Sequence, residues 1–180
     1  MTAPPPPTPN TSAATFALNA PIHMTGRLEP RSSWPAPGEE CPIARTFDAV
    51  GTKSAFVILR EAFYGATRFE EFVERTGLSE PAVAARLREL SDEGLLEKFP
   101  YQEPGQRARS GYQLTDKGGE LLPVLVAMMR WGDRWLFPHG ARVEVRHSDC
   151  GSPVRAVLRC DAGHDVEPDE LDLAQAPRRP

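Results

Sequence analysis

Two pairs of potential metal ligands lie near the end of this 180-residue chain. Two residues separate His147 from Cys150, and three separate Cys160 from His164. Imidazole nitrogen and thiolate sulfur are ligands that zinc prefers, and four of them in two close pairs could form a tetrahedral structural site. The spacing is therefore compatible with a structural zinc ion in this C-terminal segment. Nothing in the sequence requires a cofactor.

Two other interpretations of these residues stay open. Without metal, Cys150 and Cys160 would be ordinary hairpin residues or a redox pair, because VRAVLRC between them is typical of one short strand. A catalytic zinc needs an open ligand position and a general base in a pocket, and Asp149 is merely adjacent. A zinc-dependent enzyme is therefore the weakest alternative, and we expect no enzymatic activity.

The third cysteine, Cys41, precedes Pro42 at the expected start of a helix. Backbone N–H groups at a helix N-terminus stabilise a reactive thiolate, so Cys41 is a candidate redox-sensing residue. The alternative is a small residue that packs the helix, a common use of cysteine. Three widely spaced cysteines do not form a disulfide framework.

Arginine side chains gather on two predicted elements. Arg86 and Arg88 belong to a predicted helix, and Arg107 and Arg109 to a loop between two predicted strands. Guanidinium groups bind phosphates and guanine edges, so both elements favour contact with DNA. The alternative is that these arginines are solvated and paired with neighbouring acids.

The elements that position these residues follow from apolar periodicity and from capping residues. Four helices are expected first, and a pair of strands, KFPY and GYQL, follows them. Thr115 then begins one last long helix with Leu122, Leu125, Met129 and Trp131 to Trp135 on its buried positions. The four helices are Pro42 to Val50, from Thr52–Ser54 to Gly65, from Thr67 to Gly77, and from Ser79 to Gly94. This order predicts a mainly α fold with a β-hairpin wing (α+β), the winged helix-turn-helix layout.

The chain divides into three parts by composition. Residues 1–40 are proline-rich and are predicted to be a disordered tail, residues 41–137 are periodic, and residues 138–180 form a small β-rich extension. With 21 basic and 25 acidic side chains the net charge is −4, which excludes a generally basic nucleic-acid coat but not a local basic surface. No apolar run is long enough for a membrane span and no signal peptide is evident, so the expected compartment is the cytoplasm.

The segment from Cys41 to Gly132 closely resembles the HxlR-type (MarR-like) family of bacterial winged-helix transcriptional regulators. The resemblance rests on motifs in the same order and spacing. They are Cys41-Pro42, Ile58-Leu59-Arg60-Glu61, Arg68-Phe69, Arg86 to Leu90, Leu114-Thr115 with Gly118, and Trp131-Gly132. Two features depart from the family: Thr52-Lys53-Ser54 stands where Gly-Lys-Trp is usual, and the wing lacks the paired prolines.

The resemblance implies a regulator of transcription, most often a repressor, that binds a near-palindromic operator as a homodimer. Its dimer contacts would come from the long C-terminal helix and from helix one, and it would respond to a redox, electrophile or small-molecule signal. A winged-helix module that binds protein instead of DNA is the alternative, because Glu80, Glu89, Asp92 and Glu93 make the recognition helix acidic.

Unwrapping the helix that begins at Ser79 places Val83, Leu87 and Leu90 inward. The opposite face would then approach the major groove, the wing would reach a neighbouring minor groove, and helix N-termini would hold phosphates. The predicted DNA-binding residues are Lys53, Thr67, Arg68, Ser79, Pro81, Ala82, Ala85, Arg86, Arg88, Arg107 and Arg109.

Overall fold

The computed structural model describes residues 22–24, 41–102, 105 and 107–174. The described residues belong to two compact units, one of which takes in 41–156 and the other 22–24 with 157–174. Most of the predicted proline-rich tail lies outside the described residues. Within the described part, no helix combines the length and apolar character needed to cross a membrane.

The first unit begins with two helices whose ends follow from their capping residues. Helix α1 (Pro42–Val50) has proline at its first position, where no N–H is needed, and it ends at Gly51. Helix α2 (Lys53–Phe63) begins after Thr52, whose Oγ1 accepts a hydrogen bond from the Ala55 N–H at 3.1 Å. Both helices match the expected boundaries.

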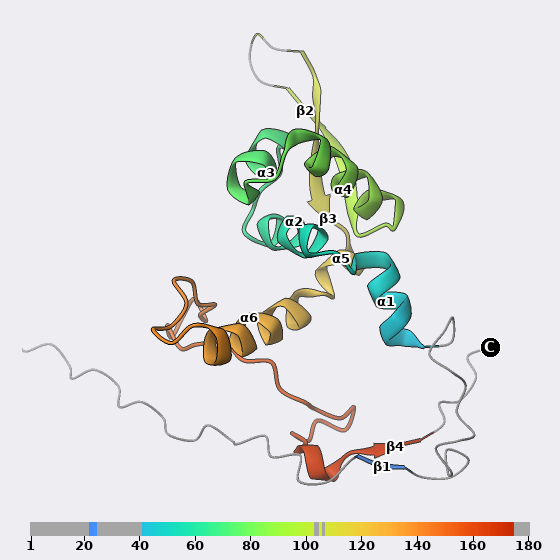
Figure 1. Ribbon diagram of the computed structural model, residues 1–180, viewed down its shortest axis with the longest axis vertical. Coiled ribbons are helices and arrows are strands. Elements are labelled where there is room, and N and C mark those ends of the chain that lie inside the picture. Colours follow the sequence, from blue (N-terminus) through green and yellow to red (C-terminus); the bar gives the residue numbers. More distant parts are fainter. Residues whose placement is uncertain (1–21, 25–40, 103–104, 106, 175–180) are drawn as a thin grey trace, which may run out of the picture. The chain divides into compact units, whose positions relative to one another are not determined.

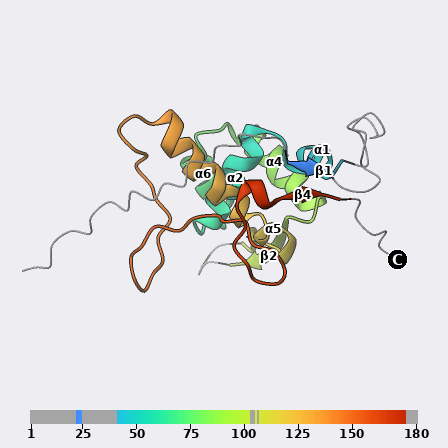
Figure 2. The same ribbon diagram turned by 90° about the horizontal axis from the view of Figure 1, so that it is seen from below.

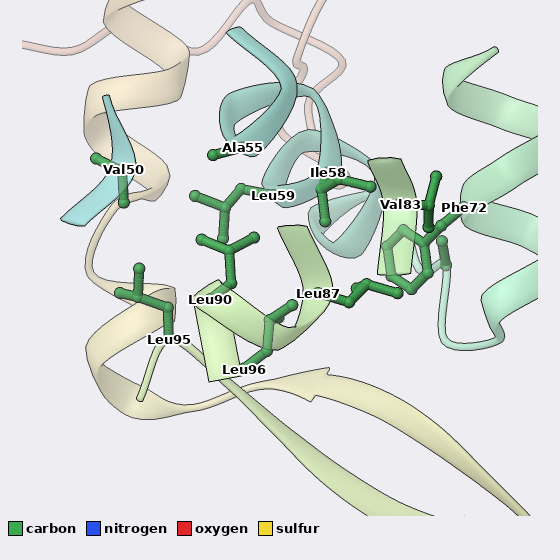
Figure 3. Packing of buried hydrophobic residues seen from close by; sticks show 11 residues of the cluster. Val50, Ala55, Ile58, Leu59, Phe72, Val83, Leu87, Leu90, Leu95 and Leu96 are labelled. Carbon is green, nitrogen blue, oxygen red and sulfur yellow. The ribbon is translucent and has the colours of Figure 1, made fainter. Parts of the chain in front are cut away.

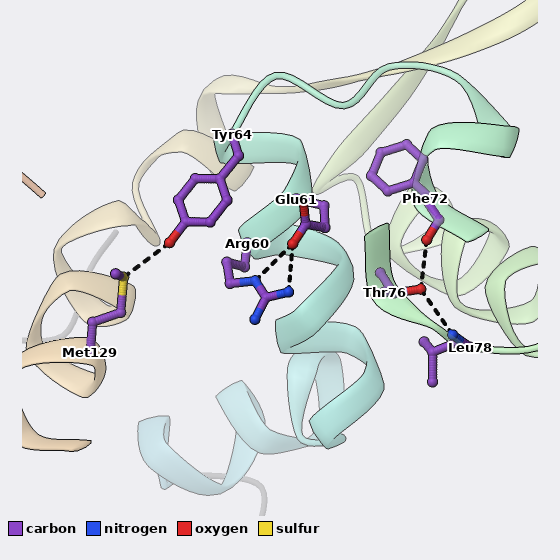
Figure 4. Close-up of polar contacts among 7 residues, drawn as sticks. All are labelled: Arg60, Glu61, Tyr64, Phe72, Thr76, Leu78 and Met129. Atoms are coloured by element: carbon purple, nitrogen blue, oxygen red, sulfur yellow. Dashed lines mark hydrogen bonds and ion pairs between the residues drawn. The ribbon is translucent and has the colours of Figure 1, made fainter. Parts of the chain in front are cut away.

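A helix–turn–helix follows, made of α3 (Phe69–Thr76) and α4 (Glu80–Asp92). Gly77 closes α3 with φ 66°, a left-handed conformation that glycine adopts without a steric penalty. The Thr76 hydroxyl donates to the Phe72 carbonyl at 2.6 Å and accepts from the Leu78 N–H at 3.2 Å (Figure 4). These bonds fix the tight turn that sets the angle between α3 and α4.

The wing is an antiparallel hairpin of β2 (Leu96–Tyr101) and β3 (Arg109–Leu114) that extends past α3 and α4 in Figure 1. Its register pairs Phe99 with Gly111, and a Cβ at Gly111 would lie 2.6 Å from the Phe99 ring. The Tyr112 N–H donates to the Thr67 carbonyl at 2.8 Å, which ties the wing to the start of α3.

The single long helix expected after Thr115 is two helices, so that prediction is wrong. Thr115 caps a short α5 (Asp116–Gly119), and the chain then turns into α6 (Leu122–Leu136). The break has a physical cause, because Gly118 and Gly119 are poor helix formers and Pro123 fits only the first turn of a new helix.

The core of this unit lies between α2, α3, α4 and the base of the wing, as the close view in Figure 3 shows. Figure 2 looks at the same helices from below, with α2 beside α4. The predicted inward residues of α4 are confirmed, since Val83, Leu87 and Leu90 are buried. The full cluster is Val50, Ala55, Ile58, Leu59, Ala66, Phe72, Val83, Leu87, Leu90, Leu95 and Leu96. The architecture is the predicted winged helix-turn-helix, mainly helical with a β-hairpin.

The C-terminal extension contains less regular structure than expected. Two isolated antiparallel bridges, Arg146 with Pro153 and Arg159 with Asp165, each close a small hairpin turn. The segment VRAVLRC forms no continuous strand, so that expectation is wrong. Its side chains, all exposed except that of Val154, bury too little apolar surface to support a strand. In the second unit, the 3₁₀ helix Pro168–Glu170 precedes β4 (Asp172–Leu173), which pairs in parallel with β1 (His23–Met24).

Candidate nucleic-acid interface

The outward face of α4 combines small side chains with one extended cation. Ala82 and Ala85 are half-buried, and Pro81 and Arg88 are exposed. Ser79 is the N-cap of α4, as predicted, although its side chain makes no capping hydrogen bond. Small residues let a helix backbone approach the floor of the major groove, and alanine can contact a thymine methyl group. This face can therefore enter a groove.

Arg86 and Arg88 lie in different surroundings. The Arg86 guanidinium is 2.5 Å from the Glu89 carboxylate and its Nη1 is 3.5 Å from Thr52 Oγ1 at the start of α2. Arg86 is thus directed along the protein surface, as the alternative interpretation of a paired helix arginine expects. Arg88 is exposed, and among the described residues no ion pair is found for it. Arg88 is therefore the α4 cation best placed for a base edge.

The two arginines of the wing, Arg107 and Arg109, lie in different surroundings. Arg109 begins β3, and its Nη1 lies 2.9 Å from the Glu70 carboxylate on α3. Arg107 precedes the strand and is exposed. Two positions apart on one strand, the two arginines would point the same way, but Arg107 lies outside the strand and Glu70 holds Arg109 toward α3.

The start of α3 is occupied by the protein's own carboxylate. Glu71 Oε2 accepts hydrogen bonds from the N–H groups of Thr67 at 2.8 Å and Arg68 at 3.0 Å. These bonds, first that of Thr67, lower the pKa of Glu71, with a smaller contribution from Arg75. The predicted phosphate seat at these N–H groups is thus filled, and the N-cap is Arg68, not Thr67.

Aromatic residues of the wing, which no sequence motif indicates as functional, complete this surface. The Arg68 guanidinium lies 5.1 Å from the centre of the Tyr101 ring, and the Lys98 ammonium lies 5.8 Å from that of Tyr112. The register of the hairpin pairs Lys98 with Tyr112, and no local sequence pattern indicates that pairing. Lys53, at the start of α2, is exposed.

Cys41 is the N-cap of α1 and is half-buried with a free thiol. Its side chain makes no capping hydrogen bond. The structure thus leaves this thiol partly accessible next to a helix N-terminus, the position predicted for a redox-sensing residue.

The predicted metal ligands come together as two separate pairs. His147 Nδ1 lies 3.3 Å from Cys150 Sγ, and Cys160 Sγ lies 3.6 Å from His164 Nδ1. Hydrogen bonds from the Ser152 hydroxyl, the Ser152 N–H and His147 lower the pKa of Cys150 to about 7. In the part of the chain that the structure describes, no group of three or more His, Cys, Asp or Glu side chains is arranged to hold a metal ion.

Apolar side chains remain exposed on α6 and α1. Leu125 and Val126 pack inward, whereas Trp131 and Trp135 are 59% and 63% exposed. The prediction that these two tryptophans are buried against the core of their own chain is therefore wrong. Only one face of α6, which carries Leu125 and Val126, packs against that core. The other exposed apolar residues of the two helices are Ile43, Phe47, Leu122, Val124, Met128 and Leu136.

Comparisons with known proteins agree with this architecture. A family model described as HxlR-like helix-turn-helix matches residues 49–141, more than half of the chain. The HTH-type transcriptional regulator Rv3095 of Mycobacterium tuberculosis is 35% identical over 119 residues, covering 66% of this chain and 74% of that protein.

Two solved structures share the fold over most of their length. PA1607, whose name describes it as a transcription factor, is 37% identical with a TM-score of 0.64, covering 71% of this chain and 89% of that one. PA1374 from Pseudomonas aeruginosa is 31% identical with a TM-score of 0.56, covering 78% and 95% of the two chains. The family match over the helix–turn–helix, wing and α6 shows that this chain belongs to the HxlR-like helix-turn-helix family of transcriptional regulators, and is not an enzyme.

Proposed function

We propose that this protein is a homodimeric repressor that binds a near-palindromic operator in the cytoplasm and releases it on a redox or electrophile signal. The observation that carries the proposal is the outward face of α4, where the small, half-buried residues Ala82 and Ala85 precede the exposed cation Arg88.

In this proposal α4 lies in the major groove. Its two alanines allow close approach and contact thymine methyl groups, while Arg88 donates to a guanine edge. Arg107 at the wing reaches the neighbouring minor groove or its phosphates. Lys53 and Arg68, at the starts of α2 and α3, contribute charge along the DNA backbone.

Dimerisation through α6 and α1 would cover their exposed apolar side chains. Trp131 and Trp135 give α6 a broad apolar surface, and Phe47 is 59% exposed on α1. Exposed aromatic surface of this kind is typical of protein–protein contacts. A two-fold dimer would present two copies of α4 to two half-sites of an operator.

The test is charge reversal on the proposed interface. The double variant Arg88→Glu with Arg107→Glu is compared with Arg142→Glu with Arg155→Glu, which makes the same charge change on exposed residues of the same unit. DNA from upstream of the protein's own gene, or a site selected from random DNA, is the probe, with affinity measured by fluorescence anisotropy. We expect the interface variant to lose roughly 100-fold or more in affinity, as a dimer, and the control to lose little.

Two results would contradict DNA binding by this surface. One is an unchanged operator affinity in the interface variant. The other is the absence of any selected DNA site at low salt, which would favour the alternative of a protein-interaction module, consistent with the exposed acids Glu80 and Asp92 at the ends of α4.

Cys41 is the proposed sensor of the signal. An oxidant that accepts two electrons and two protons would join the Cys41 thiols of two chains as a disulfide and change the dimer geometry. Footprints of the reduced protein and of the protein treated with a mild thiol oxidant test this step. We expect oxidation to abolish protection, and Cys41→Ser to keep it; loss of protection in Cys41→Ser on oxidation would exclude Cys41.

A further inference from the structure

The outer end of the wing is held from both of its strands by the start of α3. Tyr101 and Arg109 are the last residues that β2 and β3 pair before the tip. The Arg68 guanidinium lies 5.1 Å from the centre of the Tyr101 ring. The Arg109 guanidinium donates from Nη1 to Glu70 Oε1 at 2.9 Å. Two side chains that are two positions apart at the start of α3 therefore contact the two members of one strand pair.

Contacts closer to the core fix the backbone of β3 beside α3. The Tyr112 N–H donates to the Thr67 carbonyl at 2.8 Å. The Tyr112 ring meets the buried Phe72 ring edge to face, with 6.3 Å between the ring centres. An exposed ion pair is weak when it must order two long side chains by itself. Here the backbone already places Arg109 beside Glu70, so less conformational entropy is lost when the two side chains pair.

The ion pair decides where the Arg109 guanidinium points. The side chains of Arg109 and Glu70 are 53% and 62% exposed, so the pair lies on the surface of the unit. A guanidinium presents a fork of N–H donors that fits a carboxylate and a phosphate equally well. Glu70 therefore competes with the DNA backbone for the same side chain.

We propose that Glu70 is a positioning residue for DNA binding, which holds Arg109 against α3 so that the wing meets DNA through its tip and not through the Arg109 guanidinium. This inference rests on the proposed function, because it concerns how the wing meets DNA. A phosphate contact adds affinity for every sequence alike. By withholding this contact, Glu70 lowers the affinity for DNA that lacks the operator.

The test is the salt dependence of binding to a random-sequence duplex, measured by fluorescence anisotropy. Glu70→Gln is compared with Glu74→Gln, which makes the same charge change on an exposed residue one turn further along α3. We expect Glu70→Gln to steepen the slope of log affinity against log salt by about 0.9 for each chain, because the released Arg109 gains a phosphate contact. Glu74→Gln should leave the slope as it is in the unaltered protein.

A double variant shows whether Glu70 acts through Arg109. We expect Glu70→Gln with Arg109→Gln to have the same slope as Arg109→Gln alone, since no guanidinium is left to release. The position of Arg109 is also measured without DNA, from the NMR order parameter of its Nε–H group. Glu70→Gln should lower this order parameter, and Glu74→Gln should not.

The results separate this inference from the proposed function. If the unaltered protein binds DNA, the inference is overturned by equal slopes in Glu70→Gln and Glu74→Gln. It is also overturned by a steeper slope that persists without Arg109, or by an order parameter of Arg109 that Glu70→Gln leaves unchanged. If the unaltered protein binds no DNA, the proposed function fails first and this inference fails with it.

Discussion

Gly118 lies so close to the base of the wing that no larger residue fits. A Cβ at this position would be 2.1 Å from the Leu95 carbonyl oxygen, whereas one at Gly119 would meet no atom within 4 Å. We expect Gly118→Ala to lower the free energy of unfolding by about 1–3 kcal/mol, because the backbone of the wing must move. Gly119→Ala is the control and should be neutral or slightly stabilising. Equal denaturation midpoints for the two variants would contradict this packing.

Arg107 and Arg109 should contribute differently to DNA binding. Arg107 is exposed, whereas Arg109 is 2.9 Å from Glu70. We expect Arg107→Ala to weaken binding to all sequences alike and to reduce the salt dependence. Each phosphate contact contributes about 0.9 to the slope of log affinity against log salt, so a dimer would lose about two. Arg142→Ala is the control. An unchanged slope in Arg107→Ala would show that Arg107 does not contact phosphate.

At the scale of the element, α3 depends on the carboxylate at its start. Glu71 accepts the N–H groups of Thr67 and Arg68 and lies 3.0 Å from Arg75 one turn later. We expect Glu71→Ala to cost about 1 kcal/mol of unfolding free energy through the lost cap. Urea denaturation measures this cost, and an unchanged midpoint would mean that solvent caps α3 as well as Glu71 does.

The same carboxylate predicts a pH dependence. Its hydrogen bonds lower its pKa below the ordinary 4.5, so its stabilising effect is complete above 4.5 and is lost as the pH falls through the lower value of the folded state. Glu71→Gln keeps a hydrogen-bond acceptor without the charge. We therefore expect it to be less stable than the unaltered protein at neutral pH, with the difference vanishing in acid. A difference that stays constant with pH would exclude the charge as the cause.

The polar contacts of α2 show how one element joins the rest of the fold. Glu61 is 5% exposed and accepts from the Arg60 guanidinium, with Nε at 2.9 Å, and the Tyr64 hydroxyl donates to the Met129 sulfur of α6 at 3.6 Å (Figure 4). A buried carboxylate without such a partner would be costly. The Arg60-Glu61 motif is therefore a structural part of the fold.

At the scale of the whole molecule, the exposed tryptophans of α6 predict the assembly state. We expect Trp131→Glu with Trp135→Glu to give a monomer, because charge on an apolar contact opposes dimerisation. The operator affinity of this monomeric variant should also be lower, since each half-site would then be bound independently. Val157→Glu, on an exposed apolar residue of the other unit, is the control. Sedimentation velocity separates the two outcomes, and a dimer that persists in the double variant would place the contact elsewhere.

The sequence by itself determined the winged-helix architecture and the inward face of α4. Capping residues and 3.6-residue periodicity act over a few neighbouring positions, so Thr52, Ser79 and the Val83, Leu87 and Leu90 stripe could be recognised without the fold. The two thiol–imidazole pairs could be recognised for the same reason, because His147 and Cys150 lie three positions apart and Cys160 and His164 lie four apart.

Only the tertiary structure decided which of the predicted DNA-binding groups already form ion pairs or hydrogen bonds within the protein. Glu70 is far from Arg109 in the sequence and pairs with it across the fold, and Glu71 fills the N-terminus of α3 that a phosphate was expected to use. The close approach of Gly118 to the Leu95 carbonyl at the base of the wing is likewise decided by the tertiary structure. Such contacts depend on the path of the backbone between distant residues, which local patterns do not contain.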